Sequence, residues 1–495
     1  MILKRSMAVR LAVAASIALS AARGQDVALM AANEAGAALV RLSVSRTSSG
    51  ALSAATLTVD AEAKFSAFSV REGESGAPLI TRMGVLDLSD PLAQVAVEKL
   101  ISNPSGLSLW IDDRSYGALN TAQESRFEAE LLPENQSPPN FLLKAAAPVG
   151  VSVYTLPGGE SGARATALAF EMTARFLGPV GVTGLHLHAG AAGVVGRAIA
   201  ASTLSPARVL VSVTGLLGYR ETLVSSKPET AAALAAVLGS PGNHYLDLHT
   251  AAIPLGAMRG QLMPASSAPP SLLTVLASGS DISLTTLAQG GLMSVYGRNL
   301  AQGAGGAGNP DGSAAWSLNG ASLTIGNFNA PMLWAAPDVI LAQVPFEVSP
   351  GTYPVRITTA SGESRTFDVR VAAVAPALFQ DAAGGLCLKN SDYSRVTAQN
   401  PATPGEIVFC YATGLGQTSP PLRTAAPAPA DPLANVSGVS VSVGPATVNP
   451  VYAIATPGSV GTYQIAFAVP QVTGAAQVSI AVRGASSNRV QLHVR

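Results

Sequence analysis

The sequence predicts an all-β protein made of tandem β-sandwich modules, and two observations carry this prediction. Short runs rich in Val, Leu, Thr and Ser recur along the chain, and most alternate apolar with small polar residues, as half-buried strands do. Gly, Pro, Asn or Asp separates these runs at roughly 8 to 12 residues, the spacing typical of sandwich strands. The clearest runs are Ala55–Val59, Arg208–Val213, Ser322–Ile325, Tyr353–Thr358 and Val439–Val443. Helical patterns are scarce, and Pro91–Ile101 and Glu229–Leu238 are the best candidates.

Composition limits the classes of function. The 495 residues carry 30 Lys+Arg and 30 Asp+Glu, so the formal net charge is zero, and 12% are charged where about 25% is usual. This balance excludes a basic nucleic-acid binder and an acidic solvating tail. The 48 Gly and 34 Pro show no G-X-Y period, and 48% of residues are hydrophobic. Collagen and simple disorder are therefore excluded as well.

The N-terminus is typical of an export signal. Lys4, Arg5 and Arg10 precede the apolar run Leu11–Ala22, and small residues follow at a suitable cleavage position. We predict a signal peptide at residues 1–24 and a secreted, extracellular or cell-surface protein; the alternative is a buried first helix. No later window approaches the ~18 to 20 continuous apolar residues of a membrane span, so no membrane span is predicted.

An internal repeat organises the N-terminal half. Residues 99–112 align with 236–249, each running from the end of a predicted helix into a strand, and the segments 128–133 and 259–264 close the two copies. A second repeat relates Gly291–Leu300 to a later segment beginning at Gly405. We therefore predict these bounds: a degenerate first copy at 40–135, a second copy at 145–264, a linker at 265–274, and two further sandwiches at 275–373 and 374–495.

The second copy contains four of the five histidines. A strand over Gly184–Gly190 puts His186 and His188 on one face, while the leucines between them point the other way. A strand over 243–249 likewise turns His249, with Asp247, away from its leucines. If the two strands are neighbours, these imidazoles gather on one outer face, where they suit Zn or Cu.

A second interpretation of the histidines stays open. They are also consistent with polar outer-face residues that hydrogen-bond to loops, and this interpretation is favoured. The first copy has Asp112 where the second has His249, and it contains no H-x-H. A metal site would therefore belong to the second copy alone.

Other chemical motifs are weak. The sequence has no G-x-S-x-G, H-E-x-x-H or C-x-x-C, so no catalytic residue is predicted. Gly303–Gly308 is followed by a turn and not by a helix, which favours a loop over a dinucleotide site. The three tryptophans form no ladder for carbohydrate, and packing roles are favoured. Cys387 and Cys410 are a candidate disulfide in an oxidising compartment; the alternative is two unpaired, buried thiols.

The second copy resembles the chordin (CHRD) domain. The resemblance is carried by the H-x-H strand within Gly184–Gly190, the strand Tyr245–Thr250 that ends in His-Thr, and Arg259-Gly-Gln-Leu262. It implies an extracellular β-sandwich module without a settled biochemical activity. The H-x-H strand also looks somewhat like that of copper/zinc superoxide dismutases, although the remaining ligand pattern of those enzymes is not present. The first copy lacks all three signatures.

Residues 275–495 resemble the C-terminal domain of long secreted proteins of Solibacter-type acidobacteria. The segments that carry this resemblance are Gly291–Leu300, Ala342–Pro345, Asn400–Gly405, Tyr411–Gly416 and Gly461–Gln464. It implies two immunoglobulin-like, TIG-type sandwiches and no catalytic residue.

Two hypotheses about function follow. The first is an exported, non-enzymatic protein that interacts at the cell surface or outside the cell with another protein or a surface polymer, without a cofactor. The second is a metal-binding protein or metalloenzyme, similar to superoxide dismutase, in which His186, His188 and His249 hold Zn or Cu.

Overall fold

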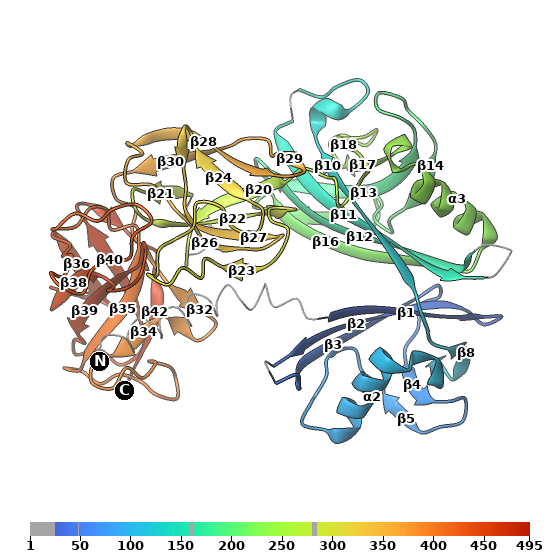
Figure 1. Cartoon of the computed structure of the whole chain (residues 1–495), viewed down its shortest axis with the longest axis horizontal. Coiled ribbons are helices and arrows are strands. Elements are labelled where there is room, and N and C mark those ends of the chain that lie inside the picture. The colour runs from blue at the N-terminus through green and yellow to red at the C-terminus, as the bar shows by residue number, and fades with distance from the viewer. Residues whose placement is uncertain (1–24, 48, 142, 159–162, 280–284) are drawn as a thin grey trace. The chain divides into compact units, whose positions relative to one another are not determined.

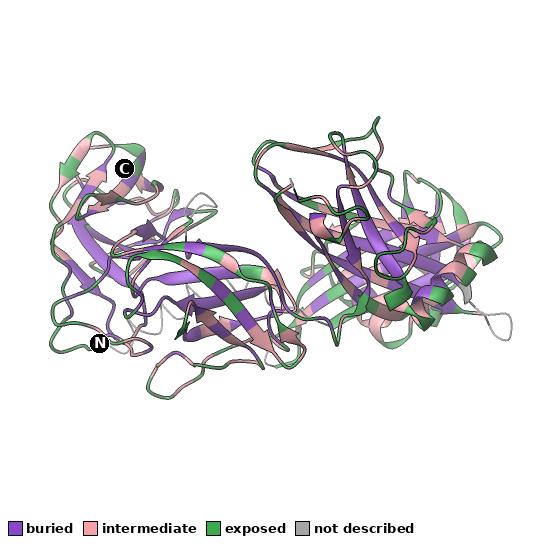
Figure 2. Cartoon of the chain, turned by 90° about the horizontal axis from the view of Figure 1, so that it is seen from above, coloured by how far each residue is buried: buried purple, intermediate pink, exposed green. Residues whose placement is uncertain are grey.

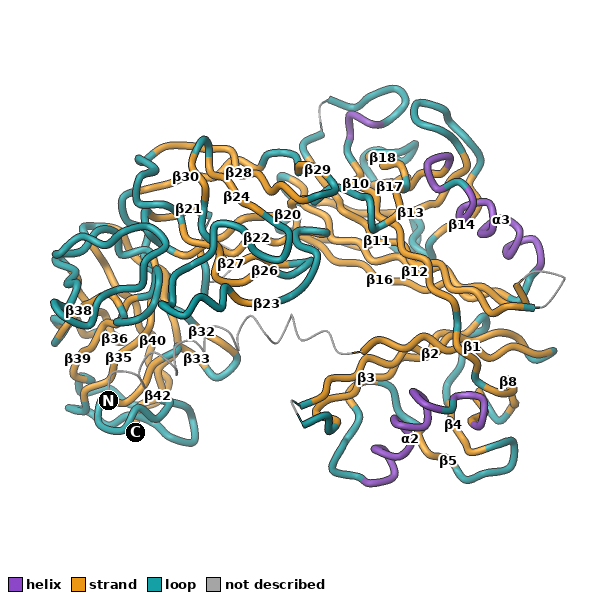
Figure 3. Tube along the Cα trace, viewed as in Figure 1, coloured by secondary structure: helices purple, strands orange, loops and turns teal. Residues whose placement is uncertain are grey.

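The computed structural model describes residues 25–495 except 48, 142, 159–162 and 280–284. Strands and turns account for nearly all of it, as Figure 3 shows, and the all-β prediction is confirmed. The described chain forms two compact units, one of residues 25–268 and the other of residues 269–495 (Figure 1). The predicted signal peptide, residues 1–24, lies outside the described residues.

The first sandwich covers residues 25–121. One sheet has the order β6 (Gly84–Val85), β3 (Leu52–Ala61), β2 (Gly36–Arg46), β1 (Gln25–Asn33) and β9 (Asn120–Thr121). The other has the order β5 (Pro78–Ile80), β4 (Phe68–Glu72), β7 (Leu107–Ile111) and β8 (Arg114–Ala118). Alternate apolar residues of both sheets, such as Leu42, Leu57 and Leu109, form one buried cluster.

The second sandwich covers residues 123–264 and repeats this plan. One sheet has the order β16 (Leu216–Ser225), β12 (Ala163–Phe176), β11 (Ala145–Pro157), β10 (Gln123–Leu131) and β19 (Met263–Pro264). The other has the order β14 (Ala198–Ala201), β13 (Val180–Ala189), β17 (His244–Thr250) and β18 (Met258–Gln261), with β15 (Leu210–Ser212) also paired to β13. Its core again draws on both sheets, with Phe170, Leu185 and Leu248 fully buried.

The boundary between these sandwiches differs from the expected one. The segment that includes Glu128–Leu131 belongs to β10, which pairs with β11 and β19 and therefore opens the second sandwich instead of closing the first. The closing strand of the first sandwich is β9, which pairs with β1 as β19 pairs with β10. Residues 116–121 are thus the structural counterpart of 259–264, and both segments have Gly second and Leu fourth.

Two helices occupy corresponding positions, one in each sandwich. They are α2 (Pro91–Ser102) and α3 (Pro228–Gly239), and each has a proline in its first turn, where the missing N–H costs nothing. Each continues through a short 3₁₀ turn, at Pro104–Gly106 and Pro241–Asn243, into β7 or β17. Neither helix in the described part of the chain is long and apolar enough to span a membrane.

The unit of residues 269–495 contains two further sandwiches. One sheet of the third sandwich has the order β20 (Ser271–Ala277), β22 (Leu292–Arg298), β27 (Val339–Gln343), β26 (Met332–Ala335) and β23 (Gly305–Gly306). The other has the order β21 (Thr286–Ala288), β30 (Phe367–Ala372), β28 (Gly351–Thr359), β24 (Ser322–Ile325) and β25 (Phe328–Asn329), with β29 (Gly362–Glu363) also paired to β28. Strand β20 begins inside the expected linker. Figure 2 shows the buried residues running through the interior of each sandwich.

The fourth sandwich completes the chain. One sheet has the order β31 (Ala377–Leu378), β35 (Ile407–Thr413), β39 (Tyr463–Ala468) and β38 (Tyr452–Ala455), with β34 (Cys387–Lys389) also paired to β35. The other has the order β37 (Ala446–Val448), β36 (Val439–Val443), β40 (Gly474–Val482) and β41 (Ala485–Ser486), with β42 (Val490–Val494) also paired to β40. The short strands β32 (Gln380–Asp381) and β33 (Gly384–Gly385) pair with each other. Cys387 and Cys410 are direct partners on β34 and β35 and form a disulfide.

Candidate metal centre

Two neighbouring strands of the second sandwich bring three histidines together. His186 and His188 lie on β13, and His249 lies on the antiparallel strand β17, where it is paired with Gly184. The adjacent leucines, Leu185 and Leu187 on β13 and Leu248 on β17, are fully buried in the core. The period of two therefore leaves the three imidazoles on the opposite face of the sheet, each of them half-buried.

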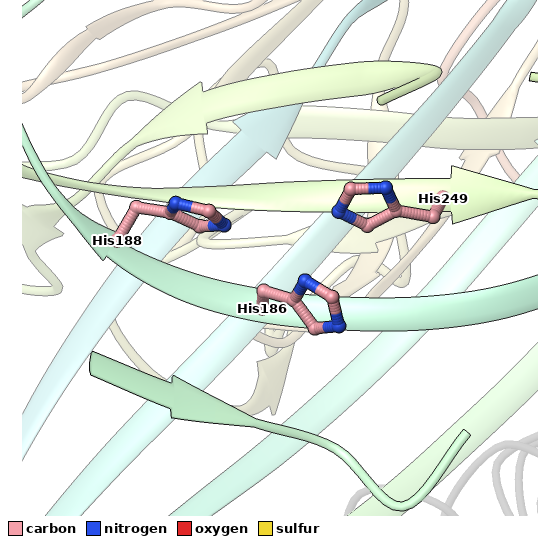
Figure 4. Close-up of side chains that lie close together, drawn as sticks. All are labelled: His186, His188 and His249. Carbon is pink, nitrogen blue, oxygen red and sulfur yellow. The ribbon is translucent and has the colours of Figure 1, made fainter. Parts of the chain in front are cut away.

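The three rings are close enough to share an ion. One nitrogen atom from each of His186, His188 and His249 lies within 4.8 Å of the other two. The ring centres of His186 and His249 are 4.4 Å apart, and those of His186 and His188 are 5.9 Å apart. Figure 4 shows the rings gathered on one side of the β13–β17 pair. We call these three side chains the histidine cluster.

Loop carbonyls fix two of the rings. His188 Nδ1 lies 3.0 Å from the carbonyl oxygen of Gly196, and His249 Nδ1 lies 3.0 Å from that of Pro254. A carbonyl oxygen only accepts, so each Nδ1 carries the proton and donates it. In the neutral rings Nε2 is then an unprotonated lone-pair donor. This is the arrangement in which a histidine ligand is oriented by a hydrogen bond from its other nitrogen.

The Nε2 atoms of these two rings have no partner. Both His188 Nε2 and His249 Nε2 are buried and make no hydrogen bond. An unsatisfied buried polar atom costs about 1 to 3 kcal/mol, so two of them side by side need an explanation. Because they lie next to a third imidazole, their lone pairs could bind an electron-pair acceptor such as a metal ion.

A missing side chain makes room for the cluster. A β-carbon added to Gly184 would lie 2.9 Å from His186 Nε2 and 3.4 Å from His249 Cδ2. Any other residue at this position would displace a ring. The pairing of β13 with β17 is also irregular here, between Val182 and Gly184. Gly184 therefore belongs to the site, although its only signal at the level of sequence is a glycine within a strand pattern.

The surroundings favour a neutral ring at His186. Burial, followed by the neighbouring His249 and His188, lowers the pKa of His186 to about 4. At neutral pH this imidazole is uncharged and its lone pair is available to a metal.

A buried carboxylate lies beside the cluster. Asp247 is paired with His186 across the strands and is 7% exposed. Its Oδ1 accepts a hydrogen bond of 2.6 Å from Gln136 Nε2, and burial raises the pKa of the carboxyl while His249 and Gln136 oppose that rise. Asp247 is not one of the converging ligands, so its carboxyl group lies beside the histidine cluster without being part of it. Gln136, which comes from a distant loop, had no recognisable sequence signal.

A second layer supports the site from β18. The Arg259 guanidinium stacks 3.4 Å from the centre of the Tyr245 ring, which itself stacks on His188 at 4.9 Å. Arg259 also donates to the carbonyl oxygens of Ala191 and Val194, at 2.8 and 3.0 Å. These contacts hold the loop that carries the Gly196 carbonyl, and hence the orientation of His188.

The remaining histidines lie elsewhere. His244 begins β17, is 6% exposed, and uses Nδ1 to donate to the carbonyl oxygen of Ser240 at 2.9 Å. His493 lies on β42 in the fourth sandwich. His244 is not one of the converging ligands in the described part of the chain, and His493 belongs to the other unit.

Residues 127–262 match the model of the CHRD domain. The chain therefore contains a CHRD domain, which spans the second sandwich from within β10 to just past β18, and the resemblance predicted from the H-x-H strand is confirmed. The histidine cluster lies inside this domain. No curated protein matches the chain.

Solved structures resemble the chain only loosely. SGBP-B of the Bacteroides ovatus mixed-linkage glucan utilization locus shares 13% identity, with a TM-score of 0.22, over 51% of this chain and 52% of its own. Domains 5–6 of the S-layer protein SbsC share 12% over 46% and 98%, with a TM-score of 0.18, and the I9–I11 tandem of titin shares 7% over 66% and 92%, with a TM-score of 0.14. The chain spans about half the length of SGBP-B. Likenesses at these TM-scores carry no argument about function.

Proposed function

We propose that this chain is an exported, modular binding protein whose CHRD domain holds one Zn or Cu ion through the histidine cluster. The observation that carries the proposal is the pair of buried, unpartnered Nε2 atoms of His188 and His249 beside the ring of His186. The all-β modules and the CHRD domain support a role outside the cytoplasm.

The geometry suits a transition metal. Zn–N bonds of ~2.0 to 2.1 Å in a tetrahedral site put ligand nitrogens about 3.4 Å apart. The cluster atoms lie within 4.8 Å of one another, so modest rotation of the rings closes the site. Imidazole suits both Zn and Cu, whereas Ca and Mg prefer oxygen ligands.

The surroundings suit a cation as well. The rings are oriented by carbonyls at Gly196 and Pro254, which fixes the tautomer that leaves Nε2 free. The Asp247 carboxylate supplies a negative charge nearby without occupying a ligand position. Three protein ligands leave a fourth position for water or for a group from a binding partner.

Metal analysis of the purified protein tests the proposal. We expect about one Zn or Cu per chain by elemental analysis after dialysis, and an affinity at least about 100-fold lower in His186→Ala and His249→Ala, because loss of second-layer partners alone costs 10- to 100-fold. His493→Ala is the matched control and keeps the metal. The proposal fails if the folded protein retains neither metal in stoichiometric amount, or if both variants retain it as well as the control does.

The exported location has a separate test. Fractionation of expressing cells should place the protein outside the cytoplasm, with its N-terminus cleaved near residue 24. An intact N-terminus on a cytoplasmic protein contradicts the extracellular role while leaving the metal measurement unaffected.

A further inference from the structure

The unit of residues 269–495 has an open recess where two long loops meet. Its volume is about 470 Å³. One wall comes from the loop before β24, with Asn309, Asp311, Ser313 and Trp316, and the other from the loop between β35 and β36, with Thr424 and Ala425. Both loops are rich in Gly, Pro and Ala, and the histidine cluster makes no use of them.

Hydrogen bonds hold the wall formed by Thr424 and Ala425 in place. The N–H of Ala314 donates to the carbonyl of Ala425 at 2.9 Å, which joins the two loops. The N–H of Ala425 in turn donates at 2.8 Å to Oε1 of Gln343, a side chain that is only 1% exposed. Thr424 Oγ1 donates to Glu347 at 2.6 Å and accepts from the N–H of Phe346 at 3.0 Å.

One residue of this wall adopts an energetically costly backbone conformation. Ala425 has φ of 67°, a left-handed value that non-glycine residues seldom adopt. Such strain costs about 1 to 3 kcal/mol and persists where the surrounding contacts over-determine it, often at ligand clamps. A wall fixed in this way loses little conformational entropy when a ligand binds.

The walls offer an aromatic surface and polar groups. Trp316 is 52% exposed, whereas Trp110 and Trp334 are partly buried. An exposed indole presents an apolar face with a polar edge. Beside it, Asp311 Oδ1 accepts from the N–H and the hydroxyl of Ser313, at 2.9 and 2.7 Å, and these bonds lower the pKa of the carboxyl. The group therefore stays a carboxylate, with acceptor capacity beyond Ser313.

We infer that this recess is a carbohydrate-binding subsite in which Trp316 stacks on the apolar face of a neutral sugar ring and the polar wall takes its hydroxyls. A purely apolar ligand would leave Asp311 and Asn309 facing an apolar group, which is unfavourable. An anionic ligand would meet a carboxylate without a balancing cation, since no Lys or Arg lines the recess among the described residues. A hydroxyl-rich ring with an apolar face satisfies both walls.

The inference rests on the proposed role outside the cell, to which it adds a class of partner, a surface or matrix polysaccharide. It is independent of the metal, because the histidine cluster lies in the other unit.

Titration with oligosaccharides tests the inference. The probes are cellotetraose, maltotetraose and chitotetraose, followed by tryptophan fluorescence and calorimetry of the full exported protein. We expect at least one to bind with a Kd of roughly 0.01 to 1 mM, within the range of weak binding. Trp316→Ala should weaken binding at least about 10-fold, which corresponds to about 1.4 kcal/mol, because the stacking ring is lost. Trp316→Phe should restore part of the binding.

The controls separate this site from folding and from the metal. Phe328→Ala removes another exposed aromatic of the third sandwich and should leave binding unchanged, as should His186→Ala. Unchanged melting temperatures show that the variants are folded. The inference is overturned if none of the three sugars binds, if Trp316→Ala binds as well as the parent, or if an apolar dye and not a sugar occupies the recess.

Discussion

The first and second sandwiches place very different residues on one equivalent face. Alignment of their strand pairs puts Ser69, Arg71 and Asp112 of the first sandwich at the positions of His186, His188 and His249 of the second, because β4 pairs with β7 as β13 pairs with β17. The fold is the same, yet only one copy carries imidazoles. The position of Gly184 is taken by Ala67, which has the β-carbon that the histidine cluster excludes.

The face of the first sandwich is satisfied by its own side chains. Arg71 lies 4.5 Å over the Trp110 ring and donates to Ser69 Oγ at 2.9 Å. Trp110 Nε1 donates to Ser108 at 3.1 Å, and Asp112 accepts from the backbone N–H groups of Ser66 and Ala67. Among the described residues, this face contributes no buried side-chain atom without a partner.

The fold therefore does not require the unpartnered Nε2 atoms of His188 and His249. The strands pair in the same way in both copies. In the first sandwich the polar side chains of this face hydrogen-bond to one another and to the backbone, whereas in the second two Nε2 atoms have no partner. Function in such folds lies in a site added to the framework. Three substitutions test how far this difference extends.

The largest effect is expected from Arg259→Ala, at the counterpart of Tyr116. Arg259 is 3% exposed, and its loss removes one donor from each of the carbonyls of Ala191 and Val194 and removes the stack on Tyr245. We expect the free energy of unfolding to fall by about 3 kcal/mol. Urea denaturation measures the loss, and hydrogen exchange should localise it to β17 and β18.

The matched control for this change is Arg114→Ala. Arg114 is exposed on β8, the strand of the first sandwich that corresponds to β18. An equal loss of stability in both variants would show that the buried arginine is not what distinguishes the second sandwich.

A smaller and more local effect is expected from Gly184→Ala, which gives the second sandwich the residue that the first one has. The new β-carbon would lie 2.9 Å from His186 Nε2, so a ring must move. We expect the affinity for Zn or Cu to fall about 10- to 100-fold, as when an orienting group is lost, while the melting temperature changes little. Calorimetric metal titration gives the affinity.

Gly218→Ala serves as the comparison for this glycine. Gly218 lies in β16, where an added β-carbon meets nothing within 4 Å. If Gly218→Ala weakens metal binding as much as Gly184→Ala does, the proposed cradle is wrong.

The smallest effect is expected from Asp112→Ala in the first sandwich. Hydrogen bonds from the backbone of Ala67 and Ser66 lower the pKa of the Asp112 carboxyl below its ordinary value of 3.8. A carboxyl whose pKa is lower in the folded state stabilises the fold above the unfolded value, and this contribution is lost as the pH falls through the folded pKa. The variant should thus be less stable than the parent at neutral pH, and the difference should shrink in acid below pH 3.8.

Thermal unfolding at several pH values measures this difference, and Glu34→Gln controls for the loss of one exposed negative charge. A difference that does not change with pH would mean that the carboxylate is not what closes the first face.

Much of the arrangement around the metal centre follows from local pattern. The period of two in β13 and β17 is enough to separate Leu185 and Leu248 from His186 and His249, because burial of the leucines fixes which face the histidines take. The turn spacing likewise suffices for the all-β class.

Other features of the site depend on tertiary contacts that no local pattern records. The carbonyls of Gly196 and Pro254 meet the histidine rings only because distant loops fold over the sheet. Asp247 belongs to the predicted face, but its carboxylate turns to Gln136, which lies 111 residues away in the chain.

The boundary between the repeats differs from the predicted one for a related reason. Residues 128–133 look like a closing segment, but β10 pairs forward with β11. The Gly and Leu shared by 116–121 and 259–264 were the better signal, because both segments lead into the short closing strands.

The single residue between the first two sandwiches matters for anyone who produces the CHRD domain alone. Only Ala122 separates β9 from β10, and it is 8% exposed. A fragment starting at residue 145 would lose the whole of β10, and one starting at 127 would cut it in the middle. Either cut strips hydrogen-bond partners from β11 and bares a long apolar edge, which is a template for aggregation. A fragment that keeps the whole of β10 has to begin at the junction itself.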